Sequence, residues 1–198
     1  MKTRTEQEML RLIVAFAESD NLIRAVLMTG SRVDPQAEPD PFRDFDIVCF
    51  VTDVEPFRSR DFVLSSLGET LVVEEPLSGP WPPHDASEEY HNYNVQFADG
   101  NRIDIVFRHT DELIRELNNS LLAVLLDKDG RVPALPSPNR SSFAPVPPTE
   151  SLYWGCCTGF YFTLGSHIPK TIWRRELCAE AFMALVTDKC SRHCGVTG

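Results

Sequence analysis

The sequence has no apolar run long enough to cross a lipid bilayer, and this argues against a membrane-spanning helix. Its first residues, MKTRTEQEMLRLIVAFAESD, are charged and amphipathic. They lack the continuous apolar stretch and the small-residue cleavage site of a signal peptide. Internal repeats are also missing. We therefore expect a cytoplasmic protein with no membrane partner.

Basic residues are scarce. The chain has 19 Lys and Arg against 29 Asp and Glu, which gives a formal net charge of -10. Binding to nucleic acid requires a basic surface, so this charge argues against a nucleic acid partner. An acidic cleft attracts cations, so a cationic ligand suits the chain better. Many soluble proteins are equally acidic, and charge alone therefore does not decide the function.

The cysteines follow no regular framework. Cys49 stands alone, and the other five of the six cysteines lie between residues 156 and 198. In a reducing compartment we expect free thiols. The segment Cys190-Ser-Arg-His193-Cys194 offers three zinc ligands, but no fourth ligand is evident. A structural zinc site is therefore not expected.

Hydrophobic periodicity indicates an α+β fold that alternates strands with helices. Apolar residues recur at helical spacing between Met9 and Ala17 and predict a helix over residues 6–18. The other expected strands lie at 23–28, 45–51 and 71–74, and a hairpin is expected over 93–107. Further helices are expected at 56–68, 150–166 and 169–188. One more helix should run from 110 to 118 or beyond, with Thr110 as its N-cap.

Proline marks the expected domain boundary. Residues 131–149 contain six prolines and form the one clear linker in the sequence. We therefore expect a first domain over residues 1–130 and a second, partial helical domain over residues 150–198, which ends in an atypical tail.

The hairpin can be assigned a register from its side chains. A two-residue Asp-Gly loop would mix polar and apolar residues on each face of the hairpin. A three-residue loop at Asp99-Gly100-Asn101 pairs Gln96 with Asp104 and separates an apolar face from a largely polar one. Sheets select register in this way, so we favour the second arrangement. The polar face then holds Arg102, Asp104, Gln96 and Asn94.

A small turn and three acids carry the chemistry of the sequence. Gly30-Ser31 follows the expected strand at 23–28, and Asp44 and Asp46 lie at the start of the next strand. Residues two apart on a strand point to the same face, about 6.6 Å apart. Asp104, on the polar face of another strand, can complete a cluster with them.

Such a cluster suits a metal and a phosphate. Three unpaired carboxylates raise each other's pKa values, and a divalent cation removes this conflict. Gly30 permits close backbone approach, and Ser31 can donate to a phosphate. Arg32 can neutralise a polyphosphate or can pair with Asp34 or Asp44. Each feature alone is weak: Gly-Ser is common in turns, Asp-x-Asp can be a solvated strand start, and Asp104 can be an edge residue paired with Arg102.

Together, these residues resemble the nucleotidyltransferase superfamily. The segments MTGSRVDP, DFDIVCFVTD, VQFADGNRIDI and LLDKDG, with Lys170-Thr-Ile-Trp173-Arg174-Arg-Glu176, resemble the aminoglycoside 6-adenylyltransferases, also called streptomycin adenylyltransferases. The resemblance covers roughly residues 1–185. It implies a nucleotidyltransferase-type mixed β-sheet with flanking helices, followed by an α-helical domain. The implied reaction is metal-assisted in-line transfer of AMP from ATP to a hydroxyl of streptomycin.

The resemblance also implies roles for particular residues. The catalytic and Mg²⁺-binding residues are then Asp44, Asp46 and Asp104. The nucleotide-phosphate turn is Gly30, Ser31 and Arg32. In the second domain, Lys170 is expected to contact phosphate, and Glu176 and Trp173 to contact the antibiotic. An exposed lysine and a glutamate on a helix surface are an equally good interpretation of Lys170 and Glu176.

Family members continue into a longer helical domain, whereas this chain ends in TDKCSRHCGVTG, which does not resemble that continuation. We therefore expect a C-terminally truncated member, either a monomer or a homodimer, whose partners are ATP and a cationic aminoglycoside. Two alternatives stay open at this point. The chain is an inactive nucleotide-binding remnant, or it is a nucleotidyltransferase that modifies another acceptor.

Overall fold

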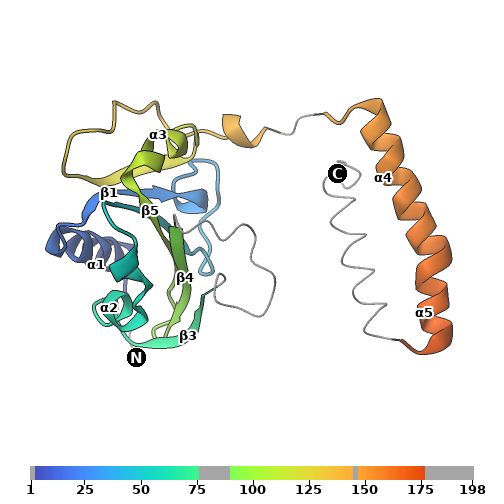
Figure 1. The fold of residues 1–198 in the computed structure, drawn as a ribbon, viewed down its shortest axis with the longest axis horizontal. Coiled ribbons are helices and arrows are strands. Elements are labelled where there is room, and N and C mark those ends of the chain that lie inside the picture. Colours follow the sequence, from blue (N-terminus) through green and yellow to red (C-terminus); the bar gives the residue numbers. More distant parts are fainter. Residues whose placement is uncertain (1–2, 76–89, 145–146, 177–198) are drawn as a thin grey trace. The chain divides into compact units, whose positions relative to one another are not determined.

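The computed structural model describes residues 3–75, 90–144 and 147–176. The chain forms two compact units, Met1–Phe143 and Ala144–Gly198, which are drawn in Figure 1. The first unit contains the sheet and the second contains the long helix. No helix among the described residues is long and apolar enough to span a membrane.

The first unit is built on a six-stranded mixed sheet. Its strand order is β3-β4-β5-β2-β1-β6, and β2 and β5 run parallel while every other neighbouring pair is antiparallel. This architecture confirms the expected α+β class. The strands are β1 (Ile23–Thr29), β2 (Phe45–Val51), β3 (Thr70–Glu74), β4 (Tyr90–Phe97), β5 (Arg102–His109) and β6 (Leu122–Asp127).

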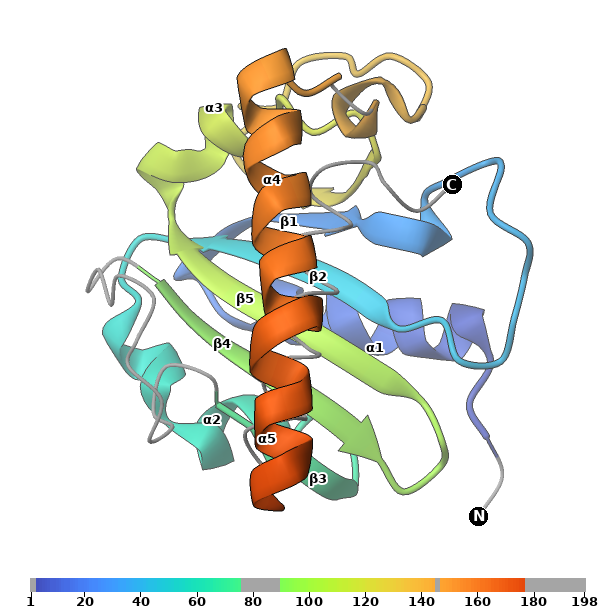
Figure 2. The ribbon, with the colours of Figure 1, turned by 90° about the vertical axis from the view of Figure 1, so that its right-hand side faces the viewer.

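One face of the sheet carries the main apolar core. It is covered by α1 (Glu6–Ser19), a 3-10 helix at Glu55–Arg58 and α2 (Arg60–Leu64), and both ribbon views show α1 and α2 against the same face (Figures 1 and 2). A capping box at Thr5 and Glu8 begins α1. The predicted stripe of α1 is confirmed as its buried side, formed by Met9, Ile13, Phe16 and Ala17.

The opposite face is divided between a smaller core and a polar surface. Leu27, Val48 and Phe50 pack there with Leu113 of α3 (Leu113–Glu116), and Val132 and Leu135 cover them. Residues 131–143, the first part of the predicted linker, thus belong to the first compact unit. Farther along the same face, β5 and β4 present polar side chains, because successive residues of a strand alternate between faces.

The hairpin of β4 and β5 corrects the predicted register. Asp104 pairs with Asn94, and Arg102 pairs with Gln96, two residues away from the expected pairing. The loop does have three residues, but these are 98–100, and the amide of Phe97 donates to the carbonyl of Asn101 at 2.9 Å. A shift of two residues leaves every side chain on its predicted face, because the strand period is two.

Asp99 holds this turn to the segment that precedes α1. Its buried carboxylate accepts hydrogen bonds from the backbone amide of Arg4 at 3.1 Å and from the Arg4 Nε at 2.5 Å. The Arg4 guanidinium also donates to the carbonyl of Leu67 at 2.6 Å. These hydrogen bonds hold the pKa of Asp99 well below its usual range. The hydrogen bonds of Arg4 with Asp99 and Leu67 therefore fix the start of α1 against the sheet.

Several predicted elements differ in detail. The helix expected at 56–68 is two short helices, because Ser59 between them is extended. The helix expected from Thr110 begins as a 3-10 turn at Thr110–Glu112, and His109, not Thr110, occupies the N-cap. Strand β6 was not predicted, because its sequence LAVLLD is an apolar run without alternation, and periodicity alone does not distinguish such a run from part of a helix.

The second unit consists of α4 (Glu150–Phe162), a π-helical turn at Thr163–His167 and α5 (Ile168–Arg174). The predicted helix at 169–188 ends early: Arg175 adopts a left-handed conformation with φ of 57°, and the amide of Glu176 donates back to Thr171 at 2.9 Å. Residues 177–188 of that predicted helix lie outside the described residues. The three potential zinc ligands Cys190, His193 and Cys194 also lie outside them.

The expectation of free thiols holds for Cys49 and Cys157, but Cys156 is disulfide-bonded.

Candidate metal and nucleotide site

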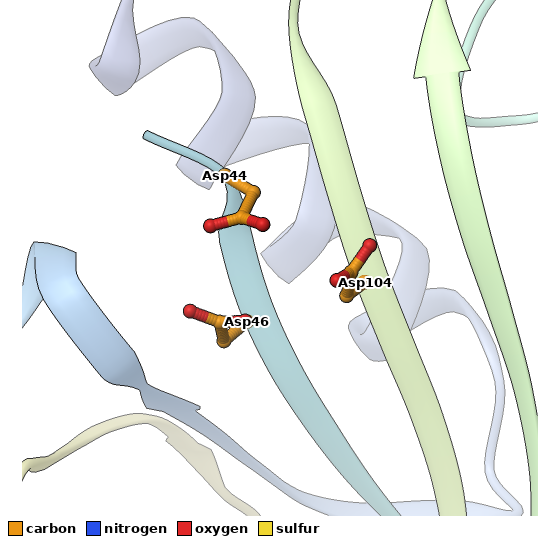
Figure 3. A group of neighbouring side chains, drawn as sticks. All are labelled: Asp44, Asp46 and Asp104. Carbon is orange, nitrogen blue, oxygen red and sulfur yellow. The ribbon is translucent and has the colours of Figure 1, made fainter. Parts of the chain in front are cut away.

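Three carboxylates meet on the polar face of the sheet, as the sequence predicts. Because β2 and β5 are parallel, Asp46 lies directly opposite Asp104, and Asp44 precedes β2 by one residue. Figure 3 shows the side chains of Asp44 and Asp46 at the start of β2 and that of Asp104 on the neighbouring strand, all three on the same face of the sheet. One oxygen from each carboxylate lies within 4.8 Å of the others. This spacing is short enough for a single ion to contact all three residues.

The cluster is electrostatically crowded. Burial, followed by the charges of Asp44 and Asp104, raises the pKa of Asp46 to about 6. Burial also raises the pKa of Asp104, against the opposing effect of Arg102. Both shifts mean that a full set of negative charges is unfavourable at this position. A divalent cation relieves the repulsion, and Mg²⁺ prefers such oxygen ligands, so the residues fit this ion.

Gly30 brings the predicted turn against the acids. Thr29 at the end of β1 pairs with Asp46, and Gly30 follows with φ of +74°. A Cβ atom at Gly30 would lie 2.0 Å from Oδ2 of Asp46. The sequence predicts close backbone approach to a ligand at this glycine. The structure shows that the space beside Gly30 is occupied by the Asp46 carboxylate.

Ser31 lies in the 3-10 turn Gly30–Arg32, directly after this contact. Its carbonyl oxygen accepts a hydrogen bond from Arg43, which holds the turn to the end of the following loop. Within the described residues, its hydroxyl has no hydrogen-bond partner and is free to donate. The expectation that this hydroxyl contacts phosphate stays a prediction.

Arg32 is engaged with the protein itself. Its Nε donates to the carbonyl of Asp44 at 2.8 Å, and its Nη2 donates to that of Arg43 at 2.6 Å. Its Nη1 pairs with Glu6 at 2.9 Å, and its guanidinium stacks over Phe45 at 3.7 Å. These contacts tie both ends of the loop between β1 and β2 together. The alternative pairing with Asp44 thus occurs through the backbone, and phosphate binding by Arg32 stays a prediction.

Arg102 is a member of the cluster that the motif does not include. Its Nη2 lies 3.0 Å from Oδ2 of Asp104, and its Nε lies 3.8 Å from Oδ2 of Asp44. From the sequence, a pair between Arg102 and Asp104 was an alternative to a metal-binding role for Asp104. The structure contains the ion pair and the acid cluster together. The signal was the spacing of two along β5, which places both side chains on one face.

The remaining predicted residues belong to the second compact unit. Lys170 and Trp173 lie in α5, and Glu176 follows its left-handed cap at Arg175. Lys170 and Glu176 therefore do not share one helix. The expected contacts of Lys170 with phosphate, and of Trp173 and Glu176 with the antibiotic, stay predictions.

The sheet and its site define a class of protein. A mixed sheet carries two acids at the start of one strand and a third on its parallel neighbour, beside a Gly-Ser turn that follows the strand on the other side. This arrangement is of the nucleotidyltransferase type. A family model described as streptomycin adenylyltransferase matches residues 3–191. The chain belongs to this family.

Curated relatives carry the same description in longer chains. Three proteins named aminoglycoside 6-adenylyltransferase are similar to this chain over 88% of its length: those of Staphylococcus aureus (32% identical, covering 62% of that protein), Campylobacter jejuni (35%, 60%) and Bacillus subtilis (32%, 61%). The chain thus spans about three fifths of the length of these relatives.

A solved structure supports the same assignment. The crystal structure of an aminoglycoside 6-adenyltransferase from Bacillus subtilis matches 91% of this chain with a TM-score of 0.54 and 27% sequence identity, and 62% of that chain is covered. The similarity extends over both compact units, because the covered share exceeds the length of either unit alone.

Proposed function

We propose that this protein transfers AMP from ATP to a hydroxyl of an aminoglycoside, with streptomycin as the acceptor and Mg²⁺ as the cofactor. The observation that carries the proposal is the convergence of three carboxylates and the Gly30-Ser31 turn at one end of the sheet. Membership of the streptomycin adenylyltransferase family supports the reaction and the acceptor class. The net charge of -10 favours a cationic acceptor.

In this proposal Asp44, Asp46 and Asp104 hold the metal. Mg²⁺ held by these carboxylates would supply positive charge that stabilises the negative charge of the phosphoryl group during an in-line displacement. The Ser31 hydroxyl donates to the triphosphate, and Gly30 keeps the turn close to Asp46. The acceptor oxygen forms a bond to the α-phosphorus, the bond from that phosphorus to the pyrophosphate oxygen breaks, and the hydroxyl proton is released.

The test is transfer of labelled AMP from ATP to streptomycin, with and without Mg²⁺. We expect transfer and pyrophosphate release only when Mg²⁺ is present. Asp46→Ala should lower the rate about 100-fold or more, because electrostatic stabilisation of the transition state has this magnitude. Asp111→Ala is a matched control, since Asp111 is an exposed acid that pairs with His109. Transfer that survives Asp46→Ala would refute the metal role.

The same assay separates the alternatives. Transfer to another aminoglycoside or to a component of a cell lysate, but not to streptomycin, would support a nucleotidyltransferase with a different acceptor. Calorimetry that detects binding of ATP with Mg²⁺ but no streptomycin binding, together with an absence of transfer, would support a nucleotide-binding remnant.

A further inference from the structure

Arg102 completes a rectangle of charges on the sheet. The parallel pairing of Phe45 with Ile103 and of Asp46 with Asp104 places Asp44 at the level of Arg102. Two neighbouring strands therefore present four charged residues at adjacent positions on one face, about 5 Å apart across the strands and about 6.6 Å apart along them. Three corners are acidic and the fourth is a guanidinium.

The guanidinium already interacts with the carboxylates that the proposed metal site requires. It donates to both oxygens of Asp104, from Nη2 to Oδ2 at 3.0 Å and from Nε to Oδ1 at 3.2 Å. It also approaches Asp44 at 3.8 Å. A shared ion would contact one oxygen of Asp104, and Arg102 already donates to both of them. A divalent cation that binds them must therefore compete with Arg102 for the same lone pairs.

We propose that Arg102 is an internal counter-ion of the cluster, which occupies the carboxylates without metal and is displaced from them when a divalent cation binds. The inference rests on the metal role in the proposed function. The side chain of Arg102 is 47% exposed, so its flexible stem can carry the guanidinium into solvent without opening the core. Displacement exchanges one positive charge for two, which matches the three carboxylates better.

The counter-ion role predicts whether removal of Arg102 strengthens or weakens metal binding. If Arg102 competes with the cation, its removal tightens metal binding. If Arg102 instead orients Asp104 for the metal, its removal weakens metal binding. The two roles therefore make opposite predictions for one variant, and the measurement needs neither ATP nor activity.

The experiment is titration of Mn²⁺ into the full chain without nucleotide, followed by calorimetry and by electron paramagnetic resonance of the free ion. We expect Arg102→Gln to bind Mn²⁺ about threefold to tenfold more tightly than the wild type at low ionic strength, because a nearby competing charge is removed. The gain should shrink as salt is added. Arg102→Lys keeps the charge and should lie between the two.

Two further variants identify the source of any change. Arg115→Gln removes the same charge from an exposed residue of α3 that pairs with Glu112, so it should leave Mn²⁺ affinity unchanged. Asp46→Ala should abolish the binding and thereby locate it at the cluster. Unchanged or weaker binding by Arg102→Gln, with Mn²⁺ still bound by the wild type, would overturn the counter-ion role alone. Absence of Mn²⁺ binding in every variant would overturn the metal role of the proposed function as well.

Thermal unfolding in EDTA gives an independent readout. Without metal, Arg102→Gln leaves the carboxylates without their guanidinium, so its midpoint should fall by about 2–4 °C relative to the wild type. Saturating Mn²⁺ should remove this difference. A midpoint that is unchanged or raised in EDTA would contradict the proposal.

Discussion

The two faces of the central sheet are made from alternate residues of the same strands, yet they have opposite character. On one face Ile103, Ile105 and Phe107 of β5 are fully buried beneath α1 and α2. On the other face Asp104 and Arg102 are partly exposed in the charged cluster. The comparison teaches that the apolar face supplies the stability that allows the other face to keep three repelling acids together.

The largest test compares two adjacent residues of β5. Phe107 is fully buried, stacks on Phe57 at 4.6 Å and meets Phe16 edge to face at 6.4 Å. Phe107→Ala should lower the free energy of unfolding by about 3–5 kcal/mol, because it opens a cavity in the main core. Urea denaturation measures this change.

Val106 provides the matched control, since it is the neighbour of Phe107 on the same strand and faces the other side of the sheet. Val106→Ala should cost about 1 kcal/mol or less, because the side chain is only partly buried. Similar losses in the free energy of unfolding for the two variants would show that the two faces of the sheet contribute equally to stability.

The character of each face could be predicted from the sequence, but the pairing of strands could not. Alternation in β4 and β5 separates apolar from polar residues, so Asp104 was placed on the correct side. A slip of two residues preserves that alternation, so the pattern does not distinguish Gln96 from Asn94 as the partner of Asp104. Register depended on which residues form the turn, and the turn begins one residue earlier than expected.

The acid cluster could be predicted because Asp44 and Asp46 are two residues apart at the start of a strand, and Asp104 lies on the polar face of another strand. The contact between Gly30 and Asp46 could not, because it joins residues far apart in the chain through the shape of a single turn. The pair of Arg102 with Asp104 could be anticipated from their spacing of two, but the approach of Arg102 to Asp44 could not, because a long side chain on a strand can reach several neighbours. Sequence patterns specify the face of a residue, whereas such contacts depend on rotamers and register.

A second test changes Gly30, where the charged face has the least room. Gly30→Ala introduces a methyl group where the Asp46 carboxylate lies and places alanine at a positive φ of +74°. The free energy of unfolding should fall by about 2–3 kcal/mol, from backbone strain together with displacement of the carboxylate. Chemical denaturation with and without Asp46→Ala in the background measures both contributions.

Gly130 is the control for backbone strain, because its φ is +63° and nothing lies within 4 Å of its position for a Cβ atom. Gly130→Ala should therefore cost about 1 kcal/mol, and Gly30→Ala should approach this value when Asp46 is also alanine. If Gly30→Ala lowered the free energy of unfolding equally with Asp46 and with alanine at position 46, the added methyl group would not collide with the Asp46 carboxylate.

The smallest expected effect is a gain in stability. The pKa of Asp46 in the folded protein is raised to about 6, so the folded state retains the proton more strongly than the unfolded chain does. Without metal, stability should consequently fall as pH rises from about 4 to about 6, and the whole penalty is present above that window. Asp46→Asn removes the penalty and should raise the free energy of unfolding by about 1–2 kcal/mol at pH 7.5, a value discounted for partial exposure.

Below about pH 4 the difference between Asp46→Asn and the wild type should vanish, because the wild-type carboxyl is then protonated in both states. Asp129→Asn tests whether any loss of negative charge has this effect, since Asp129 is an acid paired with Arg24 and its pKa is lowered by that hydrogen bond. Asp129→Asn should give no gain. If Asp46→Asn were also no more stable than the wild type at pH 7.5 in EDTA, the charged face would not oppose folding, and the contrast between the two faces would concern chemistry alone.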